Sequence, residues 1–242
     1  MKIIGVIPAR FASTRLKEKV LCEIAGKPMI QHVYERASKS KQLNSLIVAC
    51  DDIKILKAVE KFGGKAVLTD KDHPSGSDRI AQAVKNLKVD VVVNIQGDEP
   101  LINYKVIDRL ADVLLKDKQV VMATVVKKFG AGEDVSNPNV VKVIIDDDKN
   151  ALYFSRSVIP YNRNQDAVTY FKHLGIYAYR KSFLLKYTKF PKSSLELAES
   201  LEQLRVLEAG YKIKTVETQV ETIGVDTLED LKRVEIFMKK KN

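Results

Sequence analysis

Short apolar runs alternate with amphipathic segments along the first half of the chain. The runs are rich in β-branched residues and are bounded by Gly, Pro or Asp, which predicts strands. They occupy residues 3–7, 45–50, 63–69 and 89–95. Between them, residues 28–39 and 78–87 carry apolar side chains at helical spacing, and Asp51 or Asp52 can cap a further helix. This alternation predicts β-α-β crossovers and a mostly parallel sheet.

The second half is less regular, with more strand-like runs and fewer helices between them. Strands are predicted at residues 120–126, 139–145, 173–180 and 211–218. Neither half contains a linker-like stretch or an internal repeat. We therefore predict one α/β domain, residues 1–242, which contains a mixed-sheet subdomain at approximately 120–180.

Two helices are predicted near the end of the chain. Residues 193–210 predict one long helix that starts at serine and stops at Gly210. One side of it carries leucines, which we expect to face the core: Leu197, Leu201, Leu204 and Leu207. A closing helix is expected at 226–240, with Asp226 or Thr227 as its cap.

Composition narrows the class of protein without deciding its function. Of 242 residues, 45% are hydrophobic and 30% charged, as in ordinary soluble globular proteins, and no apolar run is long enough to span a membrane. The net charge of +10 comes mainly from lysines spread along the chain, which argues against a nucleic-acid surface. A positive field would also attract an anionic small substrate, but composition does not decide this. Cys22 and Cys50 have no metal or redox spacing, so we expect a cytoplasmic protein without disulfides.

A basic loop follows the first strand. In open α/β sheets, ligands bind at the carboxyl ends of the strands, so cations and hydroxyls placed there favour a phosphate site over a merely solvated loop. The groups concerned are Arg10, Ser13, Thr14, Arg15, Lys17 and Lys19. The glycine patterns of P-loops and dinucleotide sites are absent after this strand, which argues against a dehydrogenase.

An acidic turn follows the fourth strand, in the segment "NIQGDEP" at 94–100. Gly97 permits a tight turn, and Asp98 and Glu99 are expected to project at the same sheet edge as the basic loop. A triphosphate held by cations usually brings Mg²⁺, which takes carboxylate and phosphate oxygens. The alternatives are a helix cap for Asp98 and, in "HPSGSDR" at 73–79, caps for Ser75 and Ser77. The three histidines have no metal-ligand spacing, and His32 is expected to be structural.

Eight segments together resemble the 3-deoxy-manno-octulosonate cytidylyltransferase family, in the family's order from end to end. They are "IPAR-x-x-STRL-x-x-K" at 7–19, "GKPMIQHV" at 26–33, "SGSDR" at 75–79, "NIQGDEP" at 94–100, "ALYFSRSVIP" at 151–160, "KHLGIYAYR" at 172–180, "LEQLRVLEAG" at 201–210 and "GVDTLEDL" at 224–231. One departure is "LKEKVL" at 16–21, where the family more often has "LPGKPL". Other sugar nucleotidyltransferases share the first segment, whereas "KHLGIY" and "LEQLR" belong to the sugar-recognising half.

The resemblance implies a Rossmann-like nucleotide-diphosphosugar transferase fold with a mixed-sheet dimerisation subdomain. It implies transfer of CMP from CTP to the anomeric hydroxyl of the acidic eight-carbon sugar 3-deoxy-D-manno-octulosonate (Kdo), with release of pyrophosphate, for lipopolysaccharide synthesis. The alternative substrate is the 8-amino analogue of Kdo. Mg²⁺ is the implied cofactor, and a homodimer without nucleic-acid or membrane partners is expected.

The resemblance also implies the site residues. The nucleotide would be held by Ala9, Arg10, Arg15, Lys19, Ser75, Gly76 and Arg79. The sugar site would contain Gln96, Arg156, His173, Tyr177, Glu202 and Gln203, with Arg156 as the partner of the sugar carboxylate. Asp98 and Asp226 would bind the metal, and these two with Lys19 would be the catalytic residues.

Overall fold

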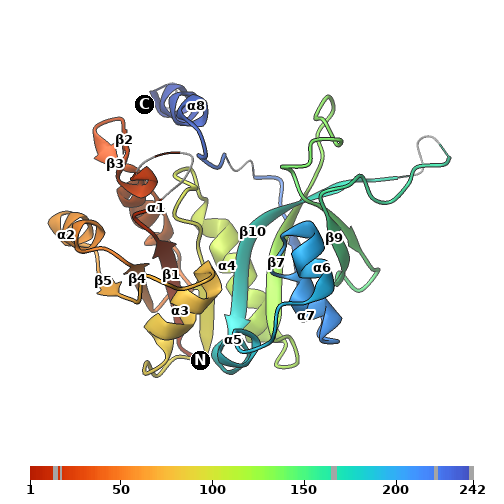
Figure 1. Cartoon of the computed structure of the whole chain (residues 1–242), viewed down its shortest axis with the longest axis horizontal. Helices are drawn as coiled ribbons and strands as arrows, with labels where there is room; N and C mark the ends of the chain where they lie inside the picture. The colour runs from red at the N-terminus through yellow and green to blue at the C-terminus, as the bar shows by residue number, and fades with distance from the viewer. Residues whose placement is uncertain (13–15, 17, 165–167, 221–222, 240–242) are drawn as a thin grey trace.

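A mixed sheet forms the centre of the protein (Figure 1). The computed structural model describes residues 1–12, 16, 18–164, 168–220 and 223–239. Within these residues the sheet has nine strands, in the order β11-β7-β10-β6-β1-β4-β5, with β8 and β9 attached to β10 as a side branch.

The N-terminal half is built from parallel β-α-β units, as predicted. β1 lies between β4 and β6 and is parallel to both, and β5 continues the parallel edge beside β4. The elements are β1 (Ile3–Ala9), β4 (Ser45–Cys50), β5 (Ala66–Leu68), β6 (Val91–Asn94), α1 (Met29–Ala37), α2 (Ile53–Lys61), α3 (Gly76–Val84) and α4 (Tyr104–Lys116). Asp52 caps α2, as expected. The strand predicted at 63–69 is shorter because Gly63 and Gly64 precede it in a turn, and α4 was not predicted.

The second half is joined through antiparallel pairing, which gives the predicted mixed sheet. The long strand β10 (Phe171–Arg180) is antiparallel to β6 and β7, and β11 is parallel to β7. The other elements here are β7 (Met122–Lys128), β8 (Lys142–Ile145), β9 (Ala151–Ser155), β11 (Lys214–Glu217) and α5 (Lys181–Tyr187). β8 and β9 form a hairpin, and the chain between β9 and β10 projects away from the body of the molecule as an arm (Figure 1). The strand β9 was not predicted.

The single long helix predicted at 193–210 is wrong. The structure has two short helices there, α6 (Ser194–Glu199) and α7 (Leu204–Glu208), because Ser200 adopts a left-handed conformation with φ of 53°. The break also separates the leucines, so that Leu201 and Leu204 are buried while 62% of Leu197 is exposed. The closing helix α8 (Leu228–Lys239) starts two residues later than predicted.

The sheet is covered on both faces because β1 alternates between them. Ile3 and Ile7 pack with apolar residues of α1, α2 and α4 on one face, whereas Ile4 and Val6 pack with residues of α3, α5 and α7 on the other. No helix in the described part of the chain is long and apolar enough to cross a bilayer.

Two short strands, β2 (Glu23–Ile24) and β3 (Lys27–Pro28), form a small hairpin after the 3-10 turn η1 (Lys19–Leu21). The hairpin lies at the same end of the molecule as α8 (Figure 1). A separate apolar cluster joins these segments, with Ile24 and Met29 on one side and Val234 and Met238 on the other. The end of the chain is thereby held beside the segment that follows β1.

Candidate active site

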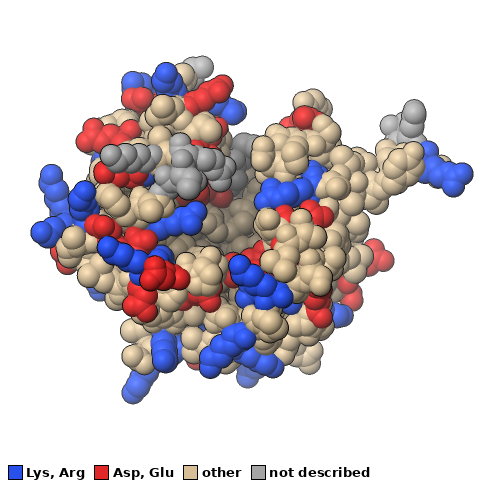
Figure 2. All heavy atoms as spheres, viewed as in Figure 1, with Lys and Arg blue, Asp and Glu red and all other residues tan. Residues whose placement is uncertain are grey.

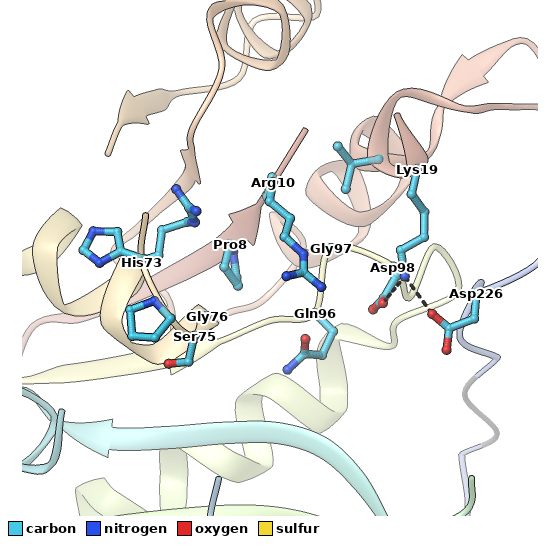
Figure 3. A pocket seen from close by; sticks show the side chains of 14 residues that line it. Pro8, Arg10, Lys19, His73, Ser75, Gly76, Gln96, Gly97, Asp98 and Asp226 are labelled. Carbon is cyan, nitrogen blue, oxygen red and sulfur yellow. Dashed lines mark hydrogen bonds and ion pairs between the residues drawn. The ribbon is translucent and has the colours of Figure 1, made fainter. Parts of the chain in front are cut away.

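A cavity of about 360 Å³ opens where β1 and β6 end (Figure 3). Both strands are parallel, so their carboxyl ends meet at one edge of the sheet, and the N-terminus of α3 reaches the same place. The cavity is lined by Pro8, Ala9, Arg10, Lys19, Val20, His73, Pro74, Ser75, Gly76, Arg79, Gln96, Gly97, Asp98 and Asp226. Figure 2 shows the molecular surface hollowed between its left and right parts, with basic side chains spread over the face rather than gathered.

Gly97 lets the acidic turn lie against the end of β1. A Cβ atom at this position would lie 3.0 Å from the carbonyl oxygen of Pro8, which is tighter than nine in ten real Cβ contacts. Gly97 is thus needed for close approach, and this approach delivers Asp98 to the cavity. Glu99 does not project there as expected, because it is buried and does not line the cavity. Burial raises the pKa of its carboxyl well above the ordinary value.

Lys19 joins the two carboxylates that were predicted to bind metal. Its Nζ lies 2.6 Å from Oδ2 of Asp98 and 2.9 Å from Oδ1 of Asp226 (Figure 3). The side chain of Lys19 is 14% exposed, and those of Asp98 and Asp226 are 34% and 46% exposed. Burial by itself lowers the pKa of Lys19, but the two carboxylates, Asp98 foremost, outweigh it and raise this pKa above its usual value. Lys19 is therefore stabilised in its protonated, positively charged form between the two carboxylates.

The donor set at this point fits a hard divalent cation. Two carboxylates from distant parts of the chain already converge on one positive charge, and Mg²⁺ in nucleotide sites usually takes one or two carboxylates together with substrate phosphates. Among the described residues, no group of three or more His, Cys, Asp or Glu side chains is placed to hold a metal alone. A metal here would therefore need oxygens from the nucleotide as well.

The N-terminus of α3 forms the opposite wall. Ser75 caps the helix as anticipated, accepting from the N–H of Asp78, and Gly76 lies beside Pro8. Arg79 is buried, and its guanidinium donates to Thr69, to the carbonyl of Asp70 and to Asp51. Such contacts fix Arg79 as a structural link of the wall.

Arg10 is exposed at the cavity, whereas the predicted nucleotide ligand Arg15 lies outside the described residues.

Asp51 links the two walls, since its Oδ1 accepts from the N–H of Phe11 at 2.8 Å while its Oδ2 pairs with Arg79 at 3.2 Å. From its place in the sequence, Asp51 was expected only as a possible helix cap. Its position directly after a strand was the signal that it also belongs to this edge.

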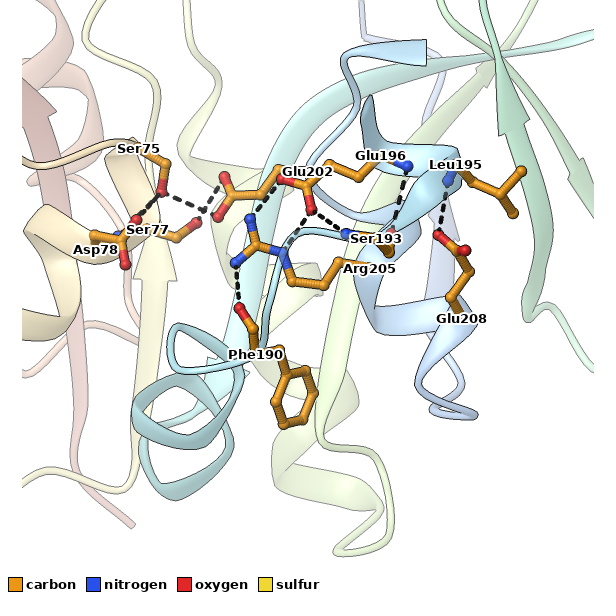
Figure 4. Close-up of polar contacts among 10 residues, drawn as sticks. All are labelled: Ser75, Ser77, Asp78, Phe190, Ser193, Leu195, Glu196, Glu202, Arg205 and Glu208. Carbon is orange, nitrogen blue, oxygen red and sulfur yellow. Dashed lines mark hydrogen bonds and ion pairs between the residues drawn. The ribbon is translucent and has the colours of Figure 1, made fainter. Parts of the chain in front are cut away.

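Most of the predicted sugar residues lie beside the cavity, across the sheet edge. Gln96 lines the cavity itself and donates from Nε2 to the carbonyl of Gly175 at 2.7 Å. Glu202 accepts from the hydroxyls of Ser75 at 3.0 Å and Ser77 at 3.3 Å (Figure 4). Burial raises the pKa of Glu202, and hydrogen bonds from Tyr187 and the two serines only partly offset that rise. Glu202 thus connects the predicted nucleotide and sugar parts.

His173 and Tyr177 flank the bulge of β10. The bulge is formed between these two residues, where Gly175 has a positive φ of 68°, and their rings lie 5.3 Å apart. His173 contacts Thr124 Oγ1 at 2.9 Å. Burial lowers the pKa of His173 to about 3 and raises that of Tyr177 well above its ordinary value. Both rings are therefore neutral at physiological pH.

Arg156 lies apart from this group. Its Nε donates to the carbonyl of Glu199 at 2.8 Å and its Nη1 to the carbonyl of Pro138 at 3.0 Å. It does not line the cavity. The structure therefore brings Gln96, His173, Tyr177 and Glu202 together beside the described nucleotide residues, but it does not bring Arg156 there.

Two buried amides lie in the segments that carry predicted sugar residues. Oδ1 of Asn94 and Nε2 of Gln203 are buried without a hydrogen-bond partner among the described residues. Buried polar groups are normally satisfied, so such atoms suggest a ligand that supplies the partner. Gln203 was predicted, but Asn94 was missed. The available signal was a polar residue at the end of an apolar strand, in the same segment as Gln96 and Asp98.

Comparisons with known proteins agree with this architecture. Residues 4–214 match the family described as cytidylyltransferase. A 3-deoxy-manno-octulosonate cytidylyltransferase of Fusobacterium nucleatum is 50% identical over 243 residues, covering 100% of this chain and 99% of that protein. One from Solibacter usitatus is 48% identical, covering 98% and 95%. A solved structure of CMP:2-keto-3-deoxy-manno-octonic acid synthetase complexed with CTP has a TM-score of 0.96 at 44% identity and covers 100% of both chains.

The fold and the polar site at the carboxyl edge of its sheet thus define a nucleotidyltransferase of the cytidylyltransferase class. Within that class, the chain belongs to the 3-deoxy-manno-octulosonate cytidylyltransferase family. A cytidylyltransferase from Leptospira borgpetersenii shares the fold at a TM-score of 0.67 with only 17% identity. The predicted family and fold class are therefore confirmed, while the roles of individual site residues stay predictions.

Proposed function

We propose that this protein transfers CMP from CTP to the anomeric hydroxyl of Kdo and releases pyrophosphate. The observation that carries the proposal is the similarity of the whole chain, at 50% identity, to an enzyme named for this reaction. The names of the relatives favour Kdo over its 8-amino analogue. Lipopolysaccharide synthesis and a cytoplasmic location are part of the same proposal.

The wall of the cavity supplies positive charge and donors for the triphosphate. CTP and a sugar acid are both anions, so their approach must be offset by cations that are already in place. Arg10 and Lys19 supply charge from one side. Ser75 and Gly76 begin α3, whose first N–H groups and positive dipole end favour phosphate. Ala9 and Arg79 would shape the pocket, with Arg79 fixed by its buried contacts.

Asp98 and Asp226 would hold Mg²⁺ together with the nucleotide, because both carboxylates reach the cavity beside Lys19. When bound, the metal ion would neutralise phosphate charge and polarise phosphoryl oxygens. The role of this chain's own residues is to position that charge. Lys19 holds the two carboxylates together and keeps a positive charge against the bound triphosphate.

The sugar would occupy the region beside the cavity where Gln96, His173, Tyr177, Glu202 and Gln203 meet. Neutral aromatic rings offer a sugar apolar faces, while the amides offer donors and acceptors for its hydroxyls. The unpartnered Nε2 of Gln203 supports this placement. The proposal that Arg156 binds the sugar carboxylate rests on the family resemblance alone, because its guanidinium lies against backbone carbonyls.

A homodimer is proposed through the projecting arm and the β8–β9 hairpin. Apolar side chains on these segments are open to solvent, with 87% of Tyr161, 57% of Leu152 and 42% of Val158 exposed. Exposed apolar groups on a projecting segment are typical of a surface that another chain covers. The arm extends well beyond the body of the molecule, where a second copy can reach it (Figure 1).

The test is pyrophosphate release from CTP with Mg²⁺ in the presence of Kdo, 8-amino-Kdo or N-acetylneuraminate. Release with Kdo in clear preference to the others is expected. Preference for the 8-amino sugar would retain the chemistry and change the substrate. Absence of release with all three, from protein that melts cooperatively, would contradict the proposed reaction.

A further inference from the structure

A second cavity, of about 520 Å³, lies apart from the active site between α1, the start of α4 and α8. It is lined by Ala25, Lys27, His32, Arg36, Lys39, Leu101, Ile102, Asn103, Tyr104, Val220, Ile223, Phe237 and Met238. None of these residues belongs to the site proposed for CTP or the sugar. The cavity therefore needs an explanation of its own.

The charged side chains that line this cavity within the described part of the chain are basic. Among its described lining residues there are three basic side chains and no acidic one. His32 and Arg36 lie four residues apart on α1, and Lys39 follows two residues after the helix ends at Ala37. Lys27 is paired with Glu35, but in the described part of the chain Arg36 and Lys39 form no ion pair with an acidic side chain. α4 also begins here, with the positive end of its dipole beside the cavity.

Apart from Asn103, the rest of the lining is apolar and partly aromatic. Tyr104 and Phe237 contribute rings, and Leu101, Val220 and Ile223 contribute aliphatic groups. A free phosphate ion would use only the cationic part of such a cavity. A small molecule that joins phosphate to a ring would use both parts, as sites for such ligands combine an apolar wall with a few well-placed polar groups.

The second cavity is lined by the same three chain segments that carry Lys19, Asp98 and Asp226, the charged triad of the active site. Lys19 is followed by Ala25 and Lys27, Asp98 by Leu101 to Tyr104, and Asp226 lies between Ile223 and Phe237. The triad residues are joined to each other by the contacts of Lys19, and the N–H of Val225 donates to the carbonyl of Asp98 at 2.9 Å. A ligand that draws these segments closer together would therefore change the relative positions of the three triad side chains.

We propose that this second cavity binds a small phosphorylated ligand with an apolar ring, of the nucleotide class, and that its occupancy is coupled to the active site. Arg36 and Lys39 hold the phosphate groups, and the ring lies against Tyr104 and Phe237. The coupling runs through the segments at 98–104 and 223–238, which line both cavities. Binding at the second cavity does not depend on the proposed reaction.

The binding test is calorimetric titration of the full chain with ATP and, separately, with inorganic phosphate. ATP is expected to bind more tightly than phosphate, and Arg36→Glu combined with Lys39→Glu is expected to weaken ATP by about tenfold or more, as for loss of charged hydrogen bonds. The matched control is Lys57→Glu with Lys61→Glu on α2, which makes the same change in net charge on two exposed lysines. Arg36→Gln with Lys39→Gln tests the same contacts without reversing charge.

Arg10→Glu separates the two cavities, because it impairs the proposed nucleotide site and leaves the second cavity unchanged. ATP binding that survives Arg10→Glu and is lost in the Arg36 and Lys39 variants supports the proposal. Binding that is abolished by Arg10→Glu alone, or that is equal in the wild type and the Arg36 and Lys39 variants, overturns it. Phosphate that binds as tightly as ATP overturns the assignment of a ring-bearing ligand.

Coupling is read from the affinity for CTP measured with and without saturating ATP. A change of about fivefold or more is expected in the wild type and not in the Arg36→Glu, Lys39→Glu double variant. Simple competition at the active site would persist in that double variant and would overturn the coupling. Since both readouts are direct binding measurements, their failure is distinguishable from a failure of the proposed transferase reaction.

Discussion

Gly175 shows how one residue sets the geometry of the site. Its φ of 68° falls in the region that favours glycine, and it forms the bulge between His173 and Tyr177. The carbonyl of Gly175 accepts a hydrogen bond from Gln96 at 2.7 Å. A Cβ atom there would meet nothing within 4 Å, so the effect of a substitution comes from the backbone conformation and not from a clash.

Gly175→Ala is therefore expected to cost about 1 kcal/mol of stability and to raise the KM for Kdo by displacing the carbonyl that holds Gln96. The measurements are urea denaturation and steady-state kinetics. Gly132→Ala is the matched control, since Gly132 also has positive φ, 80°, and open space around its Cβ position. Both variants should lose similar stability, and an unchanged KM in Gly175→Ala would contradict the role given to the bulge.

Lys19→Met is expected to lower kcat/KM for CTP on the order of a hundredfold, as for loss of one charge-stabilising donor. The physical reason is that two carboxylates, Asp98 and Asp226, would face each other and the triphosphate without the ammonium between them. Pyrophosphate release measures the effect, with Lys57→Met on the exposed face of α2 as the control. Equal activity of the two variants would assign Lys19 a structural role only.

His173 predicts a specific dependence of stability on pH. Its pKa is lowered by burial from 6.5 to about 3 in the folded protein, so below pH 6.5 the unfolded chain binds a proton that the native state does not. The contribution of the neutral imidazole to the free energy of unfolding is complete above pH 6.5. It is lost as pH falls toward 3, by up to about 1.4 kcal/mol per pH unit. Denaturation across this range should show a shallower slope for His173→Gln. An identical slope would show that the imidazole becomes protonated without unfolding.

At the scale of elements, the break between α6 and α7 places Glu202 against α3. A continuous helix over 193–210 would carry the residues that follow Ser200 along the axis of α6. Because Ser200 is left-handed, the chain turns there, and Glu202 reaches Ser75 and Ser77 (Figure 4). The capping box of Ser193 and Glu196 and the ion pair between Glu196 and Arg205 hold the two short helices together.

Ser200→Gly is expected to raise the free energy of unfolding by about 0.5 kcal/mol, because glycine adopts the left-handed conformation without the Cβ penalty. Ser182→Gly in α5 is the control, since the same substitution within a right-handed helix should lower stability by about 0.5 kcal/mol. Chemical denaturation of the two variants measures both effects. Destabilisation of equal size by both would contradict a special conformation at Ser200.

At the scale of the whole molecule, the projecting arm leaves apolar side chains open to solvent. Tyr161→Asp is expected to shift the protein from dimer to monomer, because a charge would be buried in the proposed interface. Light scattering after size-exclusion chromatography measures the mass. Ile53→Asp, at an exposed apolar position at the start of α2, should leave the mass unchanged. A monomeric wild type, or a dimer unaffected by Tyr161→Asp, would contradict the proposed interface.

The sequence by itself determined the parallel β-α-β half and the presence of Asp98 at the carboxyl edge of the sheet. It offered Asp51 or Asp52 as one helix cap and Ser75 and Ser77 as others, and the structure selects Asp52 and Ser75. These features depend on local spacing, on capping residues and on which strand precedes a loop, all of which are written in short segments. The family resemblance added Asp226 as a residue of the same site, without its geometry.

Only the tertiary structure decided which distant groups meet. Lys19 and Asp226 are 207 positions apart, and their contact depends on the packing of α8 beside β2. The left-handed conformation of Ser200 overrides the local preference for helix, and the contacts that hold Arg156 away from the cavity are made with the distant residues Glu199 and Pro138. The neighbours of a side chain are set by the free energy of the whole packed chain. They therefore cannot be predicted from a short segment of the sequence.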